Sequence, residues 1–486
     1  MMINKFKDTS RTMTSSTEIS ILDFGASTSS ANNKVAIQSA INHAQTLSKH
    51  PYDIVRVVVP NGLFRVNGTI YAKSNVALVG GGVIKASNNA SFDIVDWGGI
   101  AVPTGGKTLY AMVGEDGNPI KRSMLGDVVF DYNGENQDVE PSMSYLGISV
   151  VHAEDCFLFN TVSENAMYEK IEAIETPDKS QGLCLFIAHA KRTTVIGGRY
   201  WKSGYDAIRV AGGAEDTKLT NVFAGKAKRG AIQMTPDSNI VHLDGCTFDN
   251  REGGTSTSHA LFGHNMRNVY GNNLTLLAKD GYCISFFSDG NTNRVGQSKH
   301  VNLKNVVMQN EDERYININS LVEELWVEDV SIEGIALTGD KASKVSGYHP
   351  IYLQRVNGVN IKVNIPKSNM NPLFLGRLKN AEIDLNLVSD KPLDYGVSFI
   401  SGQTVKNIKL KLNVDAPSTL LALKSYGFSD NIRIADSVLN TIDSVDIPSG
   451  DTNVMLRDCD FRNVQNADKL RLLLSTDKKM DNVIVA

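Results

Sequence analysis

The chain has 486 residues, 21% of them charged, and a net charge of −4. Its basic residues are dispersed, which excludes the clustered positive patch of a nucleic-acid-binding protein, so we expect no nucleic-acid partner. No apolar run approaches the roughly 18 residues of a membrane-spanning helix, so we expect no membrane span. Residues 1–18 are polar and lack the apolar centre of a secretory signal, and they are predicted to form a flexible attachment peptide.

The segment after this peptide predicts one helix flanked by short strands. Within residues 35–45 the apolar side chains keep helical spacing, at Ile37, Ala40, Ile41 and Ala44. Strand signals flank the helix, at residues 21–26, 55–60 and 63–66. We expect the apolar face of the helix to cover the open end of a sheet, because an uncovered sheet edge invites aggregation.

A strand-turn-strand unit then recurs along most of the chain. Its corner is occupied by Asn, Asp or Gly, residue types that tolerate the left-handed conformation, at Asn221, Asp244-Gly245, Asn273, Asn305 and Asp329. The corners are about 22 to 34 residues apart, the self-similarity expected when one structural coil stacks on the next. The predicted fold class is all-β, a single-stranded right-handed parallel β-helix with an N-terminal capping helix.

The organisation along the chain follows from where the repeat is regular. Loop signals interrupt it at residues 85–145 and 163–180, and a solenoid usually carries such insertions on its binding face. We therefore predict an attachment peptide, an N-terminal cap with the first coils, a β-helix with the binding groove, and C-terminal coils, at residues 1–18, 19–82, 83–340 and 341–486. The five cysteines are far apart and are predicted to be buried and unpaired.

The N-terminal motifs resemble those of a known family. Phe24-Gly25-Ala26, the helix Ala36-Ile37-Gln38-Ser39-Ala40-Ile41 and the strand pair around Val59-Pro60-Asn61-Gly62 are similar to the start of pectin-lyase-like proteins, above all phage tailspikes and capsule depolymerases. The loop from Ser27 to Lys34 departs from the family pattern. The resemblance implies a homotrimer on the virion tail that depolymerises a bacterial surface polysaccharide, capsular or O-antigen. It also implies that the N-terminal peptide docks onto the phage tail or another tail protein.

Candidate catalytic residues come from a second column of strands that aligns between the corners. Polar residues lead these strands, at Asp206, Arg229, His259 and Asp280. Glycan hydrolysis needs two carboxylates about 5 to 9.5 Å apart. We therefore predict Asp206 as a catalytic carboxylate, with Asp237 or Glu215 as its partner. Further candidates are Asp216, Glu175 and Asp178. The alternative interpretation of every candidate carboxylate is a solvent-exposed turn residue without a catalytic role.

Candidate substrate-binding residues surround this column. Arg209 and Arg229 are suited to grip an acidic sugar, and Trp201 and Tyr205 offer ring faces for a pyranose. Side chains suited to bind sugar hydroxyls or stack on a sugar are His242, Asp244 and His259. No His, Cys and Asp cluster has metal-ligand spacing and no nucleotide-binding motif is present, so we expect no metal and no cofactor.

The sequence leaves three functions open. The stretch Tyr205-Asp206-Ala207-Ile208 followed by Arg229-Gly230-Ala231 is similar to the polygalacturonase pattern Asp-Asp-x-Ile then Gly-His-Gly, but only Asp206 matches a catalytic position. Glycoside hydrolysis is favoured by the density of acidic residues between 175 and 290. A polysaccharide lyase acting on a uronic-acid glycan and a non-catalytic receptor-binding β-helix are the alternatives.

Overall fold

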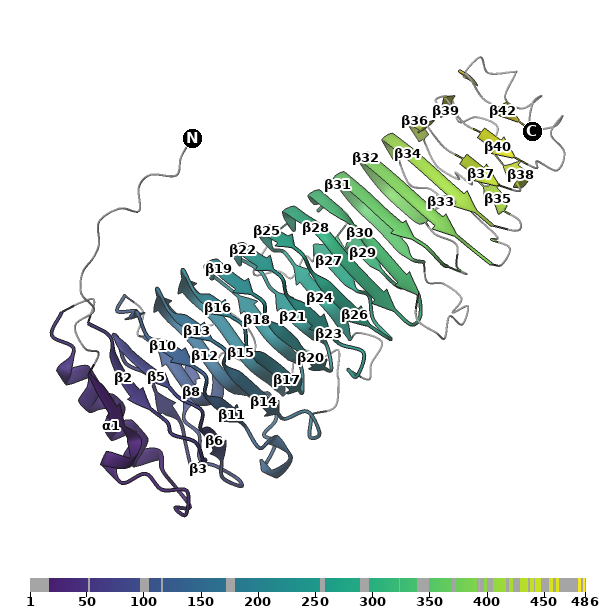
Figure 1. The fold of residues 1–486 in the computed structure, drawn as a ribbon. Helices are drawn as coiled ribbons and strands as arrows, with labels where there is room; N and C mark the ends of the chain where they lie inside the picture. The colour runs from purple at the N-terminus through teal and green to yellow at the C-terminus, as the bar shows by residue number, and fades with distance from the viewer. Residues whose placement is uncertain are drawn as a thin grey trace.

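The structure is a computed structural model and forms one elongated stack of coils, with residues 34–47 at one end and residues 484–485 at the other (Figure 1). It describes residues 17–50, 53–96, 105–114, 117–171, 180–253, 258–288, 297–322, 324–338, 349–368, 373–390 and 405–416, with shorter segments between 370 and 485. The predicted attachment peptide lies almost wholly outside the described residues. Forty strands join a single sheet, in which every pairing between named strands is parallel except that of β7 with β8.

Each coil contributes a strand to three sheet faces, here named the first, second and third sheets. The first sheet contains β4 (Ile70–Tyr71), β8 (Gly105–Val113), β12 (Ser144–Glu154), β15 (Gln181–Lys191), β18 (Asp206–Ala211), β21 (Gly230–Met234), β24 (His259–His264), β27 (Ile284–Ser288) and β29 (Ile316–Ser320). The second contains β1 (Glu18–Ser20), β2 (Val55–Val58), β5 (Val76–Val79), β10 (Met124–Gly126), β13 (Phe157–Phe159), β16 (Thr194–Ile196), β19 (Glu215–Thr220), β22 (Asn239–Asp244) and β25 (Arg267–Asn272). The third contains β3 (Leu63–Val66), β6 (Val83–Ala86), β11 (Val129–Asp131), β14 (Val162–Ala166), β17 (Arg199–Ser203), β20 (Phe223–Ala227), β23 (Thr247–Asp249) and β26 (Thr275–Ala278).

Later coils run through their corners as longer strands. These strands are β28 (Lys299–Asn310), β30 (Val327–Thr338), β31 (Ile351–Ile365), β32 (Leu373–Val388) and β34 (Val405–Asp415). The remaining strands are β7 (Ile94–Asp96), β9 (Ile120–Lys121), β33 (Val397–Phe399), β35 (Thr419–Ala422), β36 (Ser429–Ala435), β37 (Val438–Asn440), β38 (Ile442–Asp446), β39 (Val454–Arg457), β40 (Asp460–Arg462), β41 (Met480–Asp481) and β42 (Ile484–Val485). The prediction of an all-β parallel β-helix is confirmed.

The helix α1 (Lys34–Leu47) covers the N-terminal end of the stack (Figure 1). Its buried face consists of the four residues predicted from their spacing, Ile37, Ala40, Ile41 and Ala44. They pack into the same apolar core as the first strands, next to the short 3-10 helix η1 (Ile21–Phe24). A second 3-10 helix, η2 (Gly134–Asn136), lies in the insertion after β11. The predicted capping helix is confirmed.

The corner residues adopt the predicted left-handed conformation. Asn221, Gly245, Asn273 and Asn305 have φ values of 53°, 61°, 53° and 52° at the turn between the second and third sheets. Asp329 also has a positive φ of 52°, but the register pairs its neighbours with those of His300. Asp329 therefore belongs to the corner between the first and second sheets, and its assignment to the Asn305 corner was wrong. Residues with a left-handed backbone conformation recur at more than one corner of the coil, so residue type alone does not identify the corner.

One continuous apolar core fills the stack from α1 to Ile434 on β36. Cys156, Cys184, Cys246 and Cys283 are buried without disulfide bonds, as predicted, and Cys459 lies outside the described residues. Burial raises the pKa of the Cys184 thiol to about 12, so this side chain stays a neutral packing group. The four described cysteines contribute to the core and offer no reactive thiol.

Candidate functional site

A row of side chains crosses the first sheet at the point where its strands begin. Asp206, Gly230 and His259 are aligned by strand pairing, and Tyr282 and Arg314 continue the line on the next two coils. We call these five residues the site row. Adjacent coils are about 4.8 Å apart, so the site row is about 19 Å long. Of the predicted strand-leading residues, Asp206 and His259 lie in this row, whereas Arg229 and Asp280 precede it by one and two residues.

Asp206 is buried in an ion pair. Its Oδ2 accepts hydrogen bonds from Nε and Nη2 of Arg209, at 2.9 and 2.6 Å, and Nη1 of Arg209 donates to Gln181 Oε1 at 2.7 Å. Asp206 is 0% exposed and Arg209 5% exposed. Oδ1 of Asp206 has no hydrogen-bond partner among the described residues. Asp206, predicted as a catalytic carboxylate, is therefore enclosed, and the charge of Arg209 compensates its negative charge.

Aromatic and guanidinium groups alternate beside this ion pair. The guanidinium groups of Arg209 and Arg229 each lie 4.8 Å from the centroid of the Tyr205 ring. Arg229 also lies 4.7 Å from the ring centroid of Phe262, which stacks on His259 at 5.1 Å. Tyr205, Arg209, Arg229 and His259, all predicted substrate-binding residues, are therefore brought together around the site row.

His259 is held as a neutral imidazole. Its Nδ1 accepts a hydrogen bond from the backbone N–H of Tyr282 at 2.9 Å. Burial, and then the positive charges of Arg229 and Arg314, lower its pKa to about 3. A neutral imidazole in this position can exchange hydrogen bonds with hydroxyl groups but adds no positive charge.

The two predicted partners of Asp206 lie elsewhere. Glu215 begins β19 and Asp237 lies in the turn after β21, and both residues are exposed. Asp206 is at the opposite end of β18, and a strand of this length separates its two ends by about 17 Å. This separation exceeds the spacing that glycan hydrolysis needs, so Asp206 forms a close carboxylate pair with neither residue. Glu175 and Asp178 lie outside the described residues.

The other predicted binding residues face different sheets. Trp201 lies on β17 of the third sheet, 5.3 Å from the ring of Phe223. His242 lies on β22 of the second sheet, where it stacks on Tyr270 at 5.2 Å, and Asp244 ends the same strand. The predicted binding set therefore divides between separate surfaces, and only the part around the site row forms one cluster.

Two carboxylates lie close to the last residue of the site row, Arg314. Asp280 and Asp312 each precede, by the same number of residues, the paired Ile284 and Ile316 of β27 and β29, so they lie on adjacent coils. Arg314 joins them, because its Nη1 donates to the backbone oxygen of Asp280 at 2.6 Å and its Nη2 lies 3.6 Å from Asp312 Oδ2. Asp280 was predicted only as a strand-leading polar residue, and Asp312 was not among the candidates.

The environment of Asp312 favours its protonated form. Burial raises its pKa, and the negative charges of Asp280 and Glu311 raise it further, against the lowering effect of Arg314. The Asp312 side chain is 20% exposed, so it is accessible from the surface. Two close carboxyl groups, one of them with a raised pKa, are the arrangement that separates an acid from a base in glycosidases.

Comparisons with known proteins add to this geometry at the level of the fold. No protein-family model matches the sequence, and no curated protein matches it. The chain is similar to the N-terminal fragment of bacteriophage Phi29 gene product 12, with 12% identity, a TM-score of 0.50, and coverage of 92% of this chain and 71% of that one. It is also similar to a mutant tailspike protein of E. coli bacteriophage HK620 in complex with a hexasaccharide, with 11% identity, a TM-score of 0.46, and coverage of 96% and 78%.

A third similar structure is an exopolygalacturonase from Thermotoga maritima, with 11% identity, a TM-score of 0.33, and coverage of 96% of this chain and 91% of that one. The chain has the parallel β-helix fold. At these identities the likeness describes the fold alone, so the chemistry of this β-helix has to be argued from its own residues.

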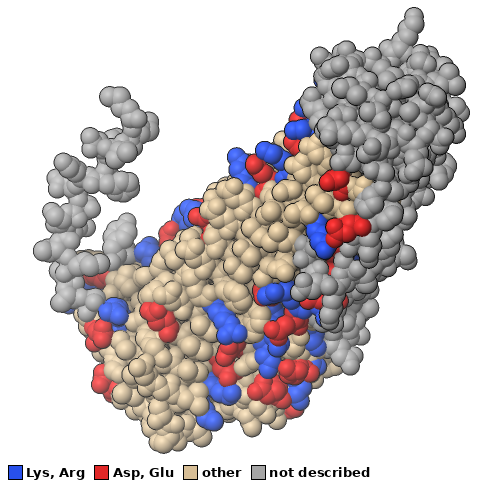
Figure 2. Space-filling view, turned by 45° about the vertical axis from the view of Figure 1, so that its right-hand side comes forward, with Lys and Arg blue, Asp and Glu red and all other residues tan. Residues whose placement is uncertain are grey.

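The surface of the β-helix carries mixed charge. Acidic and basic side chains are interleaved over the face shown in Figure 2 rather than separated by sign. Among the described residues, three or more His, Cys, Asp or Glu side chains nowhere gather as metal ligands would. Within the same residues no helix has the length and apolar character to cross a membrane.

We expect His259 to make the stability of the β-helix depend on pH. Its pKa is about 3 in the folded protein and near the ordinary value of 6.5 in the unfolded chain. Between these values the unfolded chain binds a proton that the folded protein does not, so the stabilisation present above pH 6.5 is lost as the pH falls through this window. His259→Asn keeps an acceptor for the Tyr282 N–H and should lose less stability over the window in urea titrations. Identical pH dependence in the two proteins would contradict the assignment.

Proposed function

We propose that this β-helix is a tailspike-type depolymerase that hydrolyses glycosidic bonds of a bacterial surface polysaccharide, capsular or O-antigen. The observation that carries the proposal is the adjacent Asp280 and Asp312, with the raised pKa of Asp312, at one end of a row of aromatic and cationic side chains. The N-terminal motifs of residues 21–82, similar to those of tailspikes, support the same assignment. The roles of the residues then follow from their environments.

In the proposed reaction Asp312 is the general acid and Asp280 the nucleophile. Asp312 donates its proton to the leaving glycosidic oxygen, because its raised pKa keeps it protonated to a higher pH than an ordinary aspartate. Asp280, held through its backbone by Arg314, attacks the anomeric carbon. A water molecule then hydrolyses the glycosyl-enzyme while Asp312 accepts its proton. Carboxylates on adjacent coils suit the short separation of this retaining mechanism better than the wider separation of an inverting one.

His259 of the site row and the neighbouring Tyr205 and Arg229 would bind the glycan. Tyr205 offers a ring face, His259 a neutral hydrogen-bonding imidazole, and Arg229 a cation for an acidic sugar, while the buried Phe262 supports His259 and Arg229 from below. Asp206 becomes a positioning residue in this proposal, because it fixes the Arg209 guanidinium over Tyr205. Trp201, His242 and Asp244, together with Glu215 and Asp237, lie outside this cluster and receive no catalytic role.

The test is cleavage of purified bacterial polysaccharides by the full chain. Capsular and O-antigen polysaccharides from a panel of strains are incubated with the protein, and new reducing ends are measured together with ultraviolet absorbance. Hydrolysis predicts reducing ends without absorbance from an unsaturated product. A rise in that absorbance would show a lyase acting on a uronic-acid glycan. Binding without any shortening would show a non-catalytic receptor-binding protein.

We also propose that the chain is a homotrimer on the virion tail, with residues 1–18 docking to another tail component. Large apolar side chains remain exposed on the monomer, including Leu321 at 62% and Val388 at 43%. Light scattering should give three times the 53.0 kDa mass of the chain. A mass of one chain at micromolar concentration would refute the trimer.

A further inference from the structure

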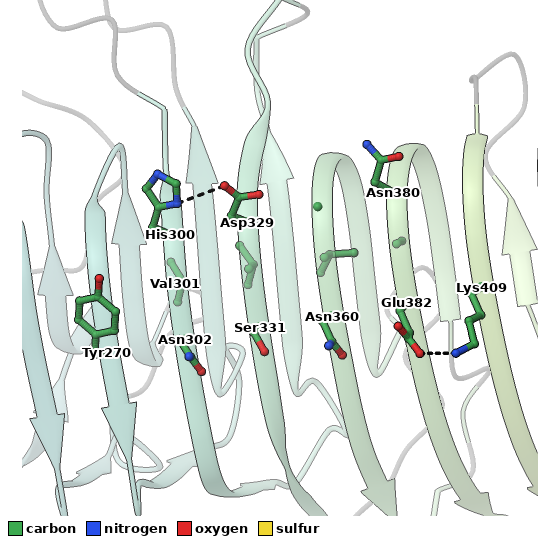
Figure 3. Close-up of a pocket in the computed structure, with 14 residues that line it drawn as sticks. Tyr270, His300, Val301, Asn302, Asp329, Ser331, Asn360, Asn380, Glu382 and Lys409 are labelled. Carbon is green, nitrogen blue, oxygen red and sulfur yellow. Dashed lines mark hydrogen bonds and ion pairs between the residues drawn. The ribbon is translucent and has the colours of Figure 1, made fainter.

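A shallow groove crosses the second sheet, whereas the site row lies on the first sheet. Its volume is about 580 Å³, and the residues that line it belong to β25, β28, β30, β31, β32 and β34 (Figure 3). Neither the comparisons nor the proposed hydrolysis assigns it a role. Since neighbouring strands are about 4.8 Å apart, the groove is about 24 Å long and can hold several units of an extended polymer.

The floor of the groove is a line of neutral polar side chains. Tyr270, Asn302, Ser331 and Asn360 occupy the same register position on four consecutive coils, and Glu382 and Lys409 follow on the next two. The labelled side chains of this line project from the same face of their strands (Figure 3). The valines that precede Asn302, Ser331 and Asn360 in the chain point into the core and are almost fully buried, so the polar side chains reach the surface of the groove in their place.

One hydrogen-bonding atom of the floor has no partner. Oδ1 of Asn302 is shielded from solvent and, among the described residues, accepts no hydrogen bond. An unpaired polar atom in such a position costs free energy that a bound hydroxyl would recover. Asn302 lies on the coil next to Tyr270, so a ligand on this ring would lie beside the Asn302 side chain, and rotation of the amide would present its oxygen to a hydroxyl group.

The charged side chains of the groove are already paired with each other. His300 Nδ1 lies 3.1 Å from Asp329 Oδ2, and Lys409 Nζ lies 2.6 Å from Glu382 Oε1 (Figure 3). Among the residues that line the groove, no cation is therefore left without a carboxylate partner, and an acidic ligand would find no free counter-charge. The end of the groove at Tyr270 offers an aromatic ring instead of an ion pair. Tyr270 is 41% exposed, and its ring is supported from one side by His242.

We propose that this groove is a second binding site for an uncharged stretch of polysaccharide, remote from the catalytic carboxylates. An exposed aromatic ring, followed by amide and hydroxyl groups at regular spacing, matches a chain of sugar rings with apolar faces and hydroxyl edges. A protein partner would be expected to bury several large apolar side chains, and the valines that line this groove are already buried in the core. The proposal does not depend on hydrolysis at Asp280 and Asp312.

The test is affinity electrophoresis of the full chain through gels that each contain one purified bacterial polysaccharide, either uncharged or rich in uronic acid. The Asp312→Asn variant is used throughout, so that cleavage cannot remove the ligand. We expect at least one uncharged polysaccharide to slow migration. Tyr270→Ala and Asn302→Ala should each weaken this binding about tenfold, the usual scale for one aromatic or hydrogen-bonding contact. Lys362→Ala, exposed on β31 outside the groove, is the matched control and should bind like its parent.

Three results would overturn the proposal. They are the absence of any uncharged polysaccharide that slows migration, unchanged binding by both groove variants, and a change of molecular mass in Tyr270→Ala, which would make this face a contact between copies of the chain. Failure of the hydrolase proposal is distinguishable from all three. It would appear as undiminished polysaccharide cleavage by Asp312→Asn, whatever the groove binds.

Discussion

Replacing Asp312 by Asn should slow polysaccharide cleavage by about 10²- to 10⁴-fold, the range for loss of a general acid. The amide keeps the shape of the side chain but has no proton to give to the leaving group. Asp280→Asn should cost at least as much, because no glycosyl-enzyme can form. Both variants should keep wild-type binding to the polysaccharide, since the site row and the second-sheet groove are unchanged. Reducing-end release and electrophoretic binding measure the two properties separately.

Glu311→Gln is the matched control for this prediction. It also tests whether neighbouring negative charge raises the pKa of Asp312. Glu311 is one of the negative charges that raise the pKa of Asp312, so its removal should lower that pKa. Asp312 would then lose its proton at a lower pH, and the fall of the rate on the alkaline side should begin earlier. The rate at acidic pH should stay near that of the wild type. An unshifted alkaline limb, or Asp312→Asn with full activity, would remove Asp312 from the mechanism.

Breaking the buried ion pair should give the largest loss of stability. Asp206→Asn leaves the Arg209 guanidinium enclosed without its carboxylate, and loss of one partner of a buried pair costs about 3 to 5 kcal/mol. Urea unfolding followed by circular dichroism measures the change. Activity of Asp206→Asn alone is therefore a poor test of catalysis, because the variant is expected to unfold more readily.

Two further variants separate charge from packing at this pair. The double variant Asp206→Leu/Arg209→Met removes both charges and should recover most of the lost stability, since apolar replacement of a buried pair is often neutral. Glu333→Gln, in an ion pair with Lys362 whose side chains are more than half exposed, should change stability by less than about 0.5 kcal/mol. If Asp206→Asn is as stable as Glu333→Gln, the pair is not enclosed in solution.

The fold was predictable because its determinants are local. Each coil repeats the same alternation and the same left-handed corner, and the cap follows from the spacing of Ile37, Ala40 and Ile41 within one helix. The wrong corner of Asp329 shows where local reasoning stops. An aspartate with positive φ fits either corner, and only its register with His300 identifies the correct one.

The site was predictable only in part, because chemistry there depends on which residues of different coils become neighbours. In the sequence, Asp206 is a carboxylate at the start of a strand and therefore a reasonable catalytic candidate. Its ion pair with Arg209 on the same strand becomes evident only when the structure shows both side chains buried. Asp312 is separated from Asp280 by a whole coil. Aligning Tyr282-Cys283-Ile284 with Arg314-Tyr315-Ile316 would have placed the two carboxylates side by side.

The site row draws one residue from each coil, and this makes its length a property that changes in whole steps. Deleting one complete coil would bring residues of more distant coils into register while leaving the core closed, because each coil contacts only its neighbours. Duplicating a coil would add about 4.8 Å to the row. Deleting part of a coil would instead leave backbone hydrogen bonds unpaired along the sheet. Gain and loss of entire coils is thus a route by which such a protein can adapt to longer or shorter saccharide repeats.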